Sequence, residues 1–183
     1  MANYGLKKPY IAQFNKATGA YSNGMKCGKA VNLSVTPNYS EASLYGDDEQ
    51  AEYEKSFNNA TVTLGVTTLP INAATVLFGH TVSGQQITYK TTDESNYVGL
   101  GTIVSEIEAG VKTYKALILP CVKFSEAANE YSTKGDTIEF KTPSIEGSAS
   151  GNNSSEWKVE KIFESASAAE TYIQEYLGIL PTT

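Results

Sequence analysis

The feature that most constrains the fold is an alternation of residue character from Lys112 to Phe124, followed by a second alternating stretch at 136–141. Alternation with a period of two places successive side chains on opposite faces of a β-strand. The even positions from 114 to 124 are apolar, whereas the odd positions are polar at both ends and apolar in the middle. The pattern predicts antiparallel sheet. The apolar patch in the middle of the odd-numbered face must then be covered by another element or another subunit.

Further segments show the same alternation. Strands are predicted at about 9–14, 30–36, 52–57, 60–67, 85–91, 97–103 and 157–163. Pro120 lies within the central strand and cannot donate to a ladder, so that strand must be bulged there or have a free edge. Gly99 and Gly101 are expected to permit a bulge or close sheet contact rather than to bind phosphate, because no third glycine and no helix follow.

Two helices are predicted. A short one follows Pro70, with Asn72 as its N-cap and Gly79 at its end. The second begins with a capping box formed by Ser167 and Glu170. Its apolar face is formed by residues at helical spacing, which are Ala169, Tyr172, Ile173 and Tyr176. Gly178 is predicted to end the helix in a left-handed conformation. The predicted fold class is therefore mainly β, an antiparallel β-sandwich or partial barrel with a C-terminal helix packed on it.

The length of 183 residues suits one domain. Residues 1–28, rich in Gly, Lys, Asn and Tyr, are predicted to form an extended N-terminal arm, and residues 29–183 a single domain. The polar stretch at 37–56 contains clustered carboxylates, for which an acidic surface or interface loop is favoured over a metal site. The Ser/Gly/Asn-rich stretch at 143–156 is predicted to be a mobile surface loop.

No motif for catalysis stands out, so we expect a protein that is not an enzyme and that has no cofactor and no catalytic or metal-binding residues. His80, the one histidine, follows the helix-closing glycine and is expected in a loop. Cys27 and Cys121 fit a reducing cytosol, and a disulfide between them is possible but has no support from spacing. No apolar run is long enough for a spanning helix, so no membrane partner is expected. The net charge of −6 argues against tight binding of nucleic acid.

Several short motifs occur in a fixed order along the chain. They are Leu44-Tyr45-Gly46-Asp47, Leu77-Phe78-Gly79-His80, Tyr97-Val98-Gly99, Tyr114-Lys115-Ala116, Val122-Lys123-Phe124, Thr133-Lys134-Gly135-Asp136 and Glu139-Phe140-Lys141-Thr142-Pro143. In this order they resemble the major tail tube proteins of long-tailed siphophages, in particular the phi13-type family.

The resemblance implies the phage tail tube fold and a structural virion protein. It implies hexameric rings that stack into the tail tube, a conduit through which DNA is ejected without specific binding. The implied partners are copies of the same chain, with the tape measure, tail terminator and distal tail proteins. The implied location is the virion tail, assembled in the cytoplasm of the host bacterium.

Two sets of residues are predicted to serve this assembly. For contacts between rings we expect Lys7, Lys8 and Lys16 of the arm to meet Asp47, Asp48 or Glu49 of a neighbouring copy. This pairing predicts that assembly weakens as salt rises. For the lumen of the tube we expect small polar residues opposite an apolar face, which are Thr61, Thr63, Thr67, Thr137 and Glu139. The alternative function is a soluble β-sandwich binding module for carbohydrate or peptide, with tyrosines and Trp157 as a stacking platform.

Overall fold

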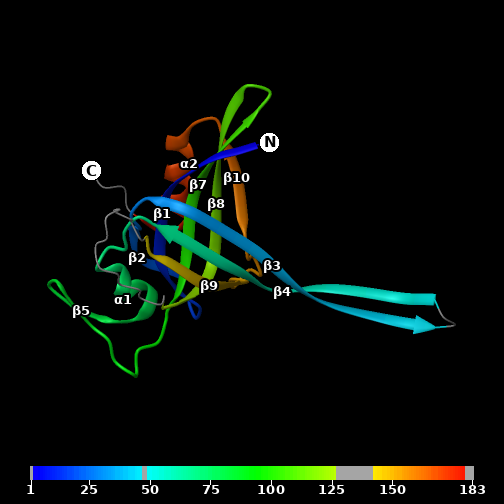
Figure 1. The fold of residues 1–183 in the computed structure, drawn as a ribbon, viewed down its shortest axis with the longest axis horizontal. Helices are drawn as coiled ribbons and strands as arrows, with labels where there is room; N and C mark the ends of the chain where they lie inside the picture. The colour runs from blue at the N-terminus through cyan, green and yellow to red at the C-terminus, as the bar shows by residue number, and fades with distance from the viewer. Residues whose placement is uncertain (1, 47–48, 127–141, 180–183) are drawn as a thin grey trace, which may run out of the picture.

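The structure, a computed structural model, describes residues 2–46, 49–126 and 142–179. Within them the protein is mainly β, with one eight-stranded antiparallel sheet, a separate two-stranded hairpin and two helices (Figure 1). The C-terminal helix packs on the sheet. The predicted fold class, mainly β with antiparallel strands and a packed C-terminal helix, is confirmed.

The elements follow one another in a simple order. The strands of the sheet are β1 (Ala2–Asn15), β2 (Ala20–Lys26), β3 (Ala30–Gly46), β4 (Glu49–Val66), β7 (Tyr97–Glu108), β8 (Val111–Ser125), β9 (Ser144–Ser150) and β10 (Val159–Phe163). The small hairpin is β5 (Thr81–Ser83) and β6 (Gln86–Thr88), and the helices are α1 (Ala73–Phe78) and α2 (Ala166–Tyr176). The strand order is β2-β1-β7-β8-β9-β4-β3, and β10 pairs with β8 beside this path.

Strand β8 is the branch point of the sheet. One edge pairs with β7, while the other pairs with β10 at residues 114–118 and with β9 at residues 121–125. Pro120 lies in the gap between these two partners, where no ladder donor is needed. The register with β7 shifts at the same point, because Val98 faces Val122 but Leu100 faces Leu119. Of the two alternatives predicted at Pro120, a bulge or a free edge, the register shift confirms the bulge.

The bulge also changes which side of the sheet the even-numbered residues of β8 face. Ala116 and Ile118 pack under α2, whereas Val122 and Phe124 pack in the interior between the two halves of the sheet. Because one inserted residue reverses the alternation, the strand can contribute to both cores. The apolar patch on the second face is therefore covered within the subunit at Leu119, a member of the interior core.

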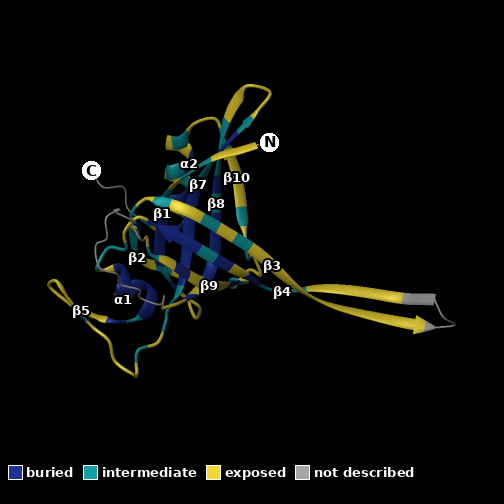
Figure 2. Cartoon of the chain, viewed as in Figure 1, coloured by how far each residue is buried: buried dark blue, intermediate teal, exposed yellow. Residues whose placement is uncertain are grey.

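The sheet folds over on itself to enclose this interior core. Ile11 of β1, Leu100 of β7 and Leu64 of β4 belong to one cluster, although β4 lies three positions from β7 in the strand order. Helix α1 closes the cluster with Val76 and Leu77. Figure 2 shows the resulting buried centre of the molecule. The geometry is that of a sandwich or partial barrel.

Two glycines of β7 allow α2 to approach the outer face of the sheet. A Cβ atom at Gly101 would lie 2.4 Å from Ile173 Cγ2, and one at Gly99 would lie 2.6 Å from Leu177 Cδ2. The prediction that these glycines serve close contact is confirmed. At the end of α2, Gly178 adopts φ 63°, the predicted left-handed stop.

The start of α2 differs from the prediction. The N-cap is Ser165, whose hydroxyl accepts a hydrogen bond from the Ala168 amide, and not Ser167. Glu170 does not complete a capping box, because its carboxylate accepts hydrogen bonds from Lys8 Nζ and from Tyr10 Oη. Its role is to tie the helix to β1. At α1, Gly79 closes the helix with φ 72° as predicted, but the side chain of Asn72 makes no capping hydrogen bond.

The capping assignment gives a first prediction. Ser165→Ala removes the only side-chain acceptor at the start of α2 within the described residues, so it should lower the free energy of unfolding by about 1 kcal/mol. Ser167→Ala, in the same turn, should change it by less than about 0.5 kcal/mol. Urea unfolding of both variants measures the difference, and an equal loss in both would contradict the assignment.

The predicted N-terminal arm is not separate from the sheet. Strand β1 lies between β7 and β2, and its residues 2–13 pair with β7. The arm prediction is therefore wrong for residues 2–26. The polar composition that suggested an arm belongs to the exposed end of the strand, where most residues before Lys8 lie. The segment from Pro9 to Ala12 is buried.

Three other segments differ from their predicted form. Residues 144–150 are a strand and not a mobile loop, since β9 pairs with both β4 and β8. Strand β3 does not end at Pro37 but continues to Gly46, which an edge strand permits because one of its sides has no ladder. The predicted strand at 136–141 lies outside the described residues. Cys27 and Cys121 are both buried and free, so the possible disulfide does not form, and burial raises the pKa of the Cys27 thiol to about 12.

Candidate functional site

The β3–β4 hairpin projects far beyond the rest of the molecule as a two-stranded ribbon (Figure 1). Its pairing is continuous from the body of the sheet out to Gly46 and Glu49. The ribbon corresponds to the polar stretch at 37–56, which the sequence predicts as a surface loop. It is a regular extension of the sheet instead, because both strands keep their cross-strand register over most of their length.

The two faces of the ribbon differ in chemistry. One face carries three cross-strand pairs, which are Tyr39–Phe57, Glu41–Lys55 and Ser43–Tyr53. The opposite face carries small and acidic residues, which are Ser40, Ala42, Glu54 and Ser56. The first face is therefore aromatic, and its charges are balanced.

The charge balance on the aromatic face comes from one ion pair. Lys55 Nζ lies 2.8 Å from Glu41 Oε1 and 4.7 Å from the centre of the Tyr39 ring. The hydrogen bond from Lys55 holds the pKa of the Glu41 carboxyl below its usual value. An exposed pair of this kind adds little to stability. Its effect is to leave a face without net charge, which suits burial against another protein surface.

The ribbon exposes several large apolar residues. The side chains of Tyr39, Leu44, Tyr45 and Tyr53 are between 46% and 69% exposed (Figure 2). A two-stranded ribbon on its own is marginally stable in water, and exposed aromatic clusters are typical of protein interfaces. The ribbon is anchored at its root, where Phe57 stacks on Trp157 with ring centroids 4.7 Å apart.

The three lysines predicted to contact a neighbour have different environments. Lys7 is exposed on β1. Lys8 has φ 52° and contacts Glu170 of its own α2, and Lys16 lies 4.0 Å above the ring of Tyr97. Asp47 and Asp48 lie outside the described residues. Glu49 begins β4, and its side chain is also outside them. Of the predicted partners, Lys7 is the one best placed to reach a second copy.

Of the residues predicted to face the lumen, Thr61 and Thr63 lie on one polar face of the sheet, and Thr67 follows the end of β4. Thr61 and Thr67 are exposed and Thr63 is half-buried, while Val62, Leu64 and Val66 on the opposite side are fully buried. The predicted alternation of this strand is confirmed. Thr61 has Thr36 and Ser148 as its cross-strand neighbours, and Thr63 has Ser34 and Glu146. Thr137 and Glu139 lie outside the described residues.

Sequence reasoning missed the part of this face that β9 contributes. Ser148 and Glu146 extend the polar face over a third strand. The signal for β9 is weak, because its inward positions are Ile145, Gly147 and Ala149, of which two are small. Small residues there are required by packing, since a Cβ at Gly147 would lie 2.7 Å from the Phe124 ring.

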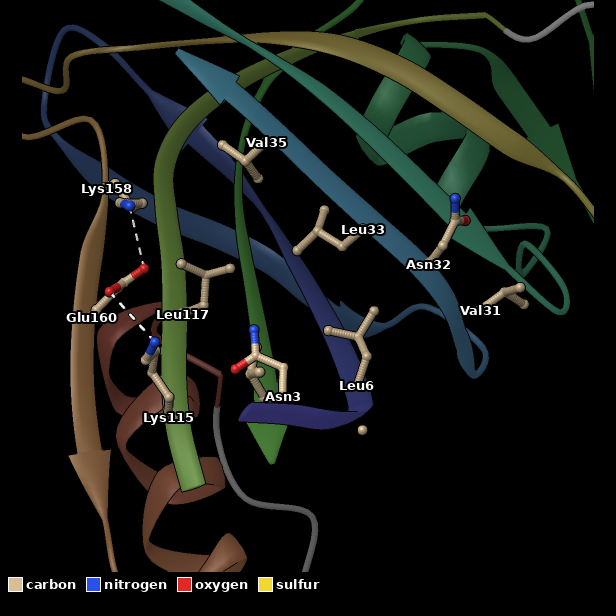
Figure 3. Close-up of a pocket in the computed structure, with 12 residues that line it drawn as sticks. Asn3, Leu6, Val31, Asn32, Leu33, Val35, Lys115, Leu117, Lys158 and Glu160 are labelled. Atoms are coloured by element: carbon tan, nitrogen blue, oxygen red, sulfur yellow. Dashed lines mark ion pairs between the residues drawn. The ribbon is translucent and has the colours of Figure 1, made fainter. Parts of the chain in front are cut away.

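A cleft of about 480 Å³ opens between the two ends of the folded sheet (Figure 3). Strand β3 is one end, and the first residues of β1 are near the other, because β2 pairs with β1 only from Tyr10 onward. The apolar lining comes from Leu6, Val31, Leu33, Val35, Val104 and Leu117. The partial barrel is thus open along this seam, which we call the seam cleft.

Charged residues line one side of the seam cleft. Lys158 Nζ lies 3.3 Å from Glu160, and Lys115 Nζ lies 3.8 Å from the same carboxylate (Figure 3). Lys115 also contacts Glu106 at 2.5 Å, and the hydrogen bond that Lys115 donates to the Glu106 carboxylate raises the pKa of the ammonium. Glu106 is buried, and its Oε2 has no hydrogen-bond partner among the described residues. The signal for this cluster in the sequence is Glu106, a single carboxylate within the mostly apolar stretch 97–107.

Two further findings concern only the described residues. No group of three or more His, Cys, Asp or Glu side chains there is arranged to hold a metal ion. None of the helices there has the length and apolar character needed to cross a membrane. The expectation that the chain is not an enzyme stays a prediction.

Comparison with known proteins does not identify the chain. Neither the models of protein families nor the curated proteins contain a match to its sequence. The resemblance to siphophage tail tube proteins therefore stays a hypothesis, and the functional argument depends on the geometry of the ribbon, the polar face and the seam.

Proposed function

We propose that this protein is a structural subunit that assembles with copies of itself into rings, and that the rings stack into the tail tube of a siphophage. The observation that carries the proposal is the projecting β3–β4 ribbon. It extends well beyond the core of its own subunit, and its aromatic face beyond Phe57, at Tyr39 and Tyr53, belongs to neither core cluster among the described residues. A second copy of the chain would cover that face.

Ring formation is supported by the free edges of the sheet. The strand order ends at β3 on one side and at β2 on the other, and each end strand has a single ladder partner among the described residues. Unpaired edges invite strand pairing between molecules. A closed ring would remove them, whereas head-to-tail stacking of rings gives an open-ended filament. A hexameric ring follows from the family resemblance alone.

The polar face of β3, β4 and β9 supports a role in lining a conduit. Most side chains on this face are short and uncharged, and Thr61 and Thr63 lie at the centre of the face. Since the chain carries a net charge of −6, it repels the phosphates of DNA and would not grip a passing duplex. In this proposal the tube works in the virion tail after assembly in the host cytoplasm, with the tape measure, tail terminator and distal tail proteins as further partners.

The proposal is tested by electron microscopy of the concentrated pure protein. Rings or tubes of uniform diameter are expected in negative stain, and their abundance should fall as NaCl is raised because the contacts between copies include ion pairs. Lys7→Glu should lower the abundance at low salt, and Lys26→Glu, an equally exposed lysine on β2, is its matched control. Featureless monomer under every condition would overturn the proposal.

A deletion of residues 2–20 would not test the contacts between copies. Removing residues 2–20 would take out β1, which lies between β7 and β2, together with the core residues Ile11 and Ala12. Such a chain is expected to unfold, so loss of assembly would say nothing about contacts between copies.

The second candidate function is a soluble binding module, and the seam cleft is the observation that favours it. Its mixed apolar and charged lining resembles that of a ligand site. Trp157, however, is stacked on Phe57 and is not available as a platform for a sugar ring. A stable monomer that binds a carbohydrate or peptide at Leu117 and Lys158 would favour this candidate over the tube.

A further inference from the structure

A second pocket, separate from the ribbon and the seam cleft, lies where α1 meets the β5–β6 hairpin. Its volume is about 170 Å³. Most of its lining is apolar and comes from Leu69, Pro70, Ile71, Ala74, Phe78, Ile87, Pro143 and Ile145. The polar lining residues are His80, Tyr89 and Glu126. A cavity of about 150 Å³ is large enough to hold one benzene ring, so this pocket has room for a single-ring molecule.

His80 is held in one orientation within this pocket. Its side chain is only 7% exposed, and its Nδ1 lies 2.8 Å from Asp93 Oδ2. The Lys90 amide donates to the same carboxylate oxygen at 2.8 Å. The Tyr89 ring packs against the imidazole with centroids 4.4 Å apart. These contacts fix the ring in place, so its second nitrogen has a defined position.

The tautomer of the neutral His80 ring follows from the ionisation of Asp93. The hydrogen bond with His80, followed by that from the Lys90 amide, holds the pKa of the Asp93 carboxyl below its usual value. Asp93 is therefore an ionised acceptor at neutral pH, and the proton of a neutral His80 must be on Nδ1. Nε2 is then a hydrogen-bond acceptor.

Nε2 of His80 is buried and makes no hydrogen bond to any described residue. Glu126 Oε2 lies 3.7 Å away, which is beyond hydrogen-bond distance, and an ionised carboxylate cannot donate. An unpaired acceptor in an apolar pocket costs free energy, and a molecule that donates to it recovers that cost.

We propose that this pocket binds a small molecule with a single apolar ring and one O–H or N–H group, and that His80 Nε2 accepts the hydrogen bond from that group. The ring fills the space beside Ala74 and Ile87, and the donor points at the imidazole. Anionic analogues are disfavoured because Asp93 and Glu126 both face the histidine. This binding site is independent of the proposed assembly into tubes.

The test uses the full chain and phenol as the probe. Because the sequence contains one histidine, the imidazole ¹⁵N signals in NMR report on His80 alone. At pH 8 the free protein should show the Nδ1–H tautomer. Phenol should shift the Nε2 signal in a saturable way, and toluene, which lacks the donor, should bind about tenfold more weakly. Benzoate should produce no saturable shift.

A filled pocket provides the variant control. Ala74→Leu occupies the space beside His80 and should abolish the phenol shift while the Nδ1–H tautomer persists. Ala168→Leu places the same side chain at an exposed position of α2 and should leave binding unchanged. The proposal is overturned by an Nε2–H tautomer in the free protein, by the absence of a saturable phenol shift, or by equal affinity for toluene. The wild-type titration decides these points even if Ala74→Leu fails to fold.

Discussion

Replacing residues 41–55 with a two-residue Asn-Gly turn is expected to give a folded monomer that forms no rings or tubes. Ser40 and Ser56 face each other across the ribbon, so a short turn can join them in the existing register. None of the described residues between them belongs to either core, and the thermal midpoint should therefore change by only a few degrees. Sedimentation velocity and negative-stain microscopy measure the loss of assembly.

The matched control for this deletion changes another exposed turn. Gly84 and Gln85 join β5 to β6 and are both exposed. Exchanging them for Asn-Gly should leave assembly unaffected. If the chain with the shortened ribbon still formed tubes of normal diameter, the ribbon would have no part in contacts between copies, and the main support for the proposed function would be gone.

Gly147→Ala should cause a large loss of stability for a change of one methyl group. Its Cβ would lie 2.8 Å from the Lys123 carbonyl oxygen and 2.7 Å from the Phe124 ring. The backbone cannot move away easily, because β9 is paired on both sides. We expect the free energy of unfolding to fall by about 3 kcal/mol, which lowers the thermal midpoint by roughly 10 °C.

Gly5→Ala is the control for this substitution. The nearest atoms to a Cβ at Gly5 belong to Ser105 at 3.6 Å, an ordinary contact distance. This variant should differ from the parent by less than about 1 kcal/mol. Urea unfolding compares the two, and a Gly147→Ala protein as stable as Gly5→Ala would show that β9 is not paired in this register.

The sequence predicts best where alternation is strong and both faces have clear partners. The half of β4 from Ala60 to Val66, the whole of β8 and the bulge at Pro120 follow from side-chain character alone. Gly79 and Gly178 follow from the chemistry of helix ends. In each case a local rule and the tertiary packing favour the same structure.

Prediction fails where pairing, rather than side-chain burial, determines the structure. β9 has few large apolar residues, yet it is a strand because two neighbours supply its ladders. The ribbon beyond Pro37 is regular although little of it is buried. The capping box predicted at Ser167 does not form, and Ser165 is the N-cap instead. Glu170 binds Lys8 and Tyr10, which are more than 150 residues away along the chain. Such long-range competition is not visible in a local pattern.

The position of β1 has a consequence for biogenesis. Ala2 pairs with Ile107, so the part of β1 before Tyr10, which β2 does not pair with, cannot join the sheet until β7, about a hundred residues later, has been synthesised. At roughly 5–20 residues per second, this delay lasts seconds. Folding that depends on such distant pairings is slow, and the nascent chain exposes Ile11 and Phe14 throughout the wait. A chaperone that shields this segment during translation should therefore raise the yield of native protein.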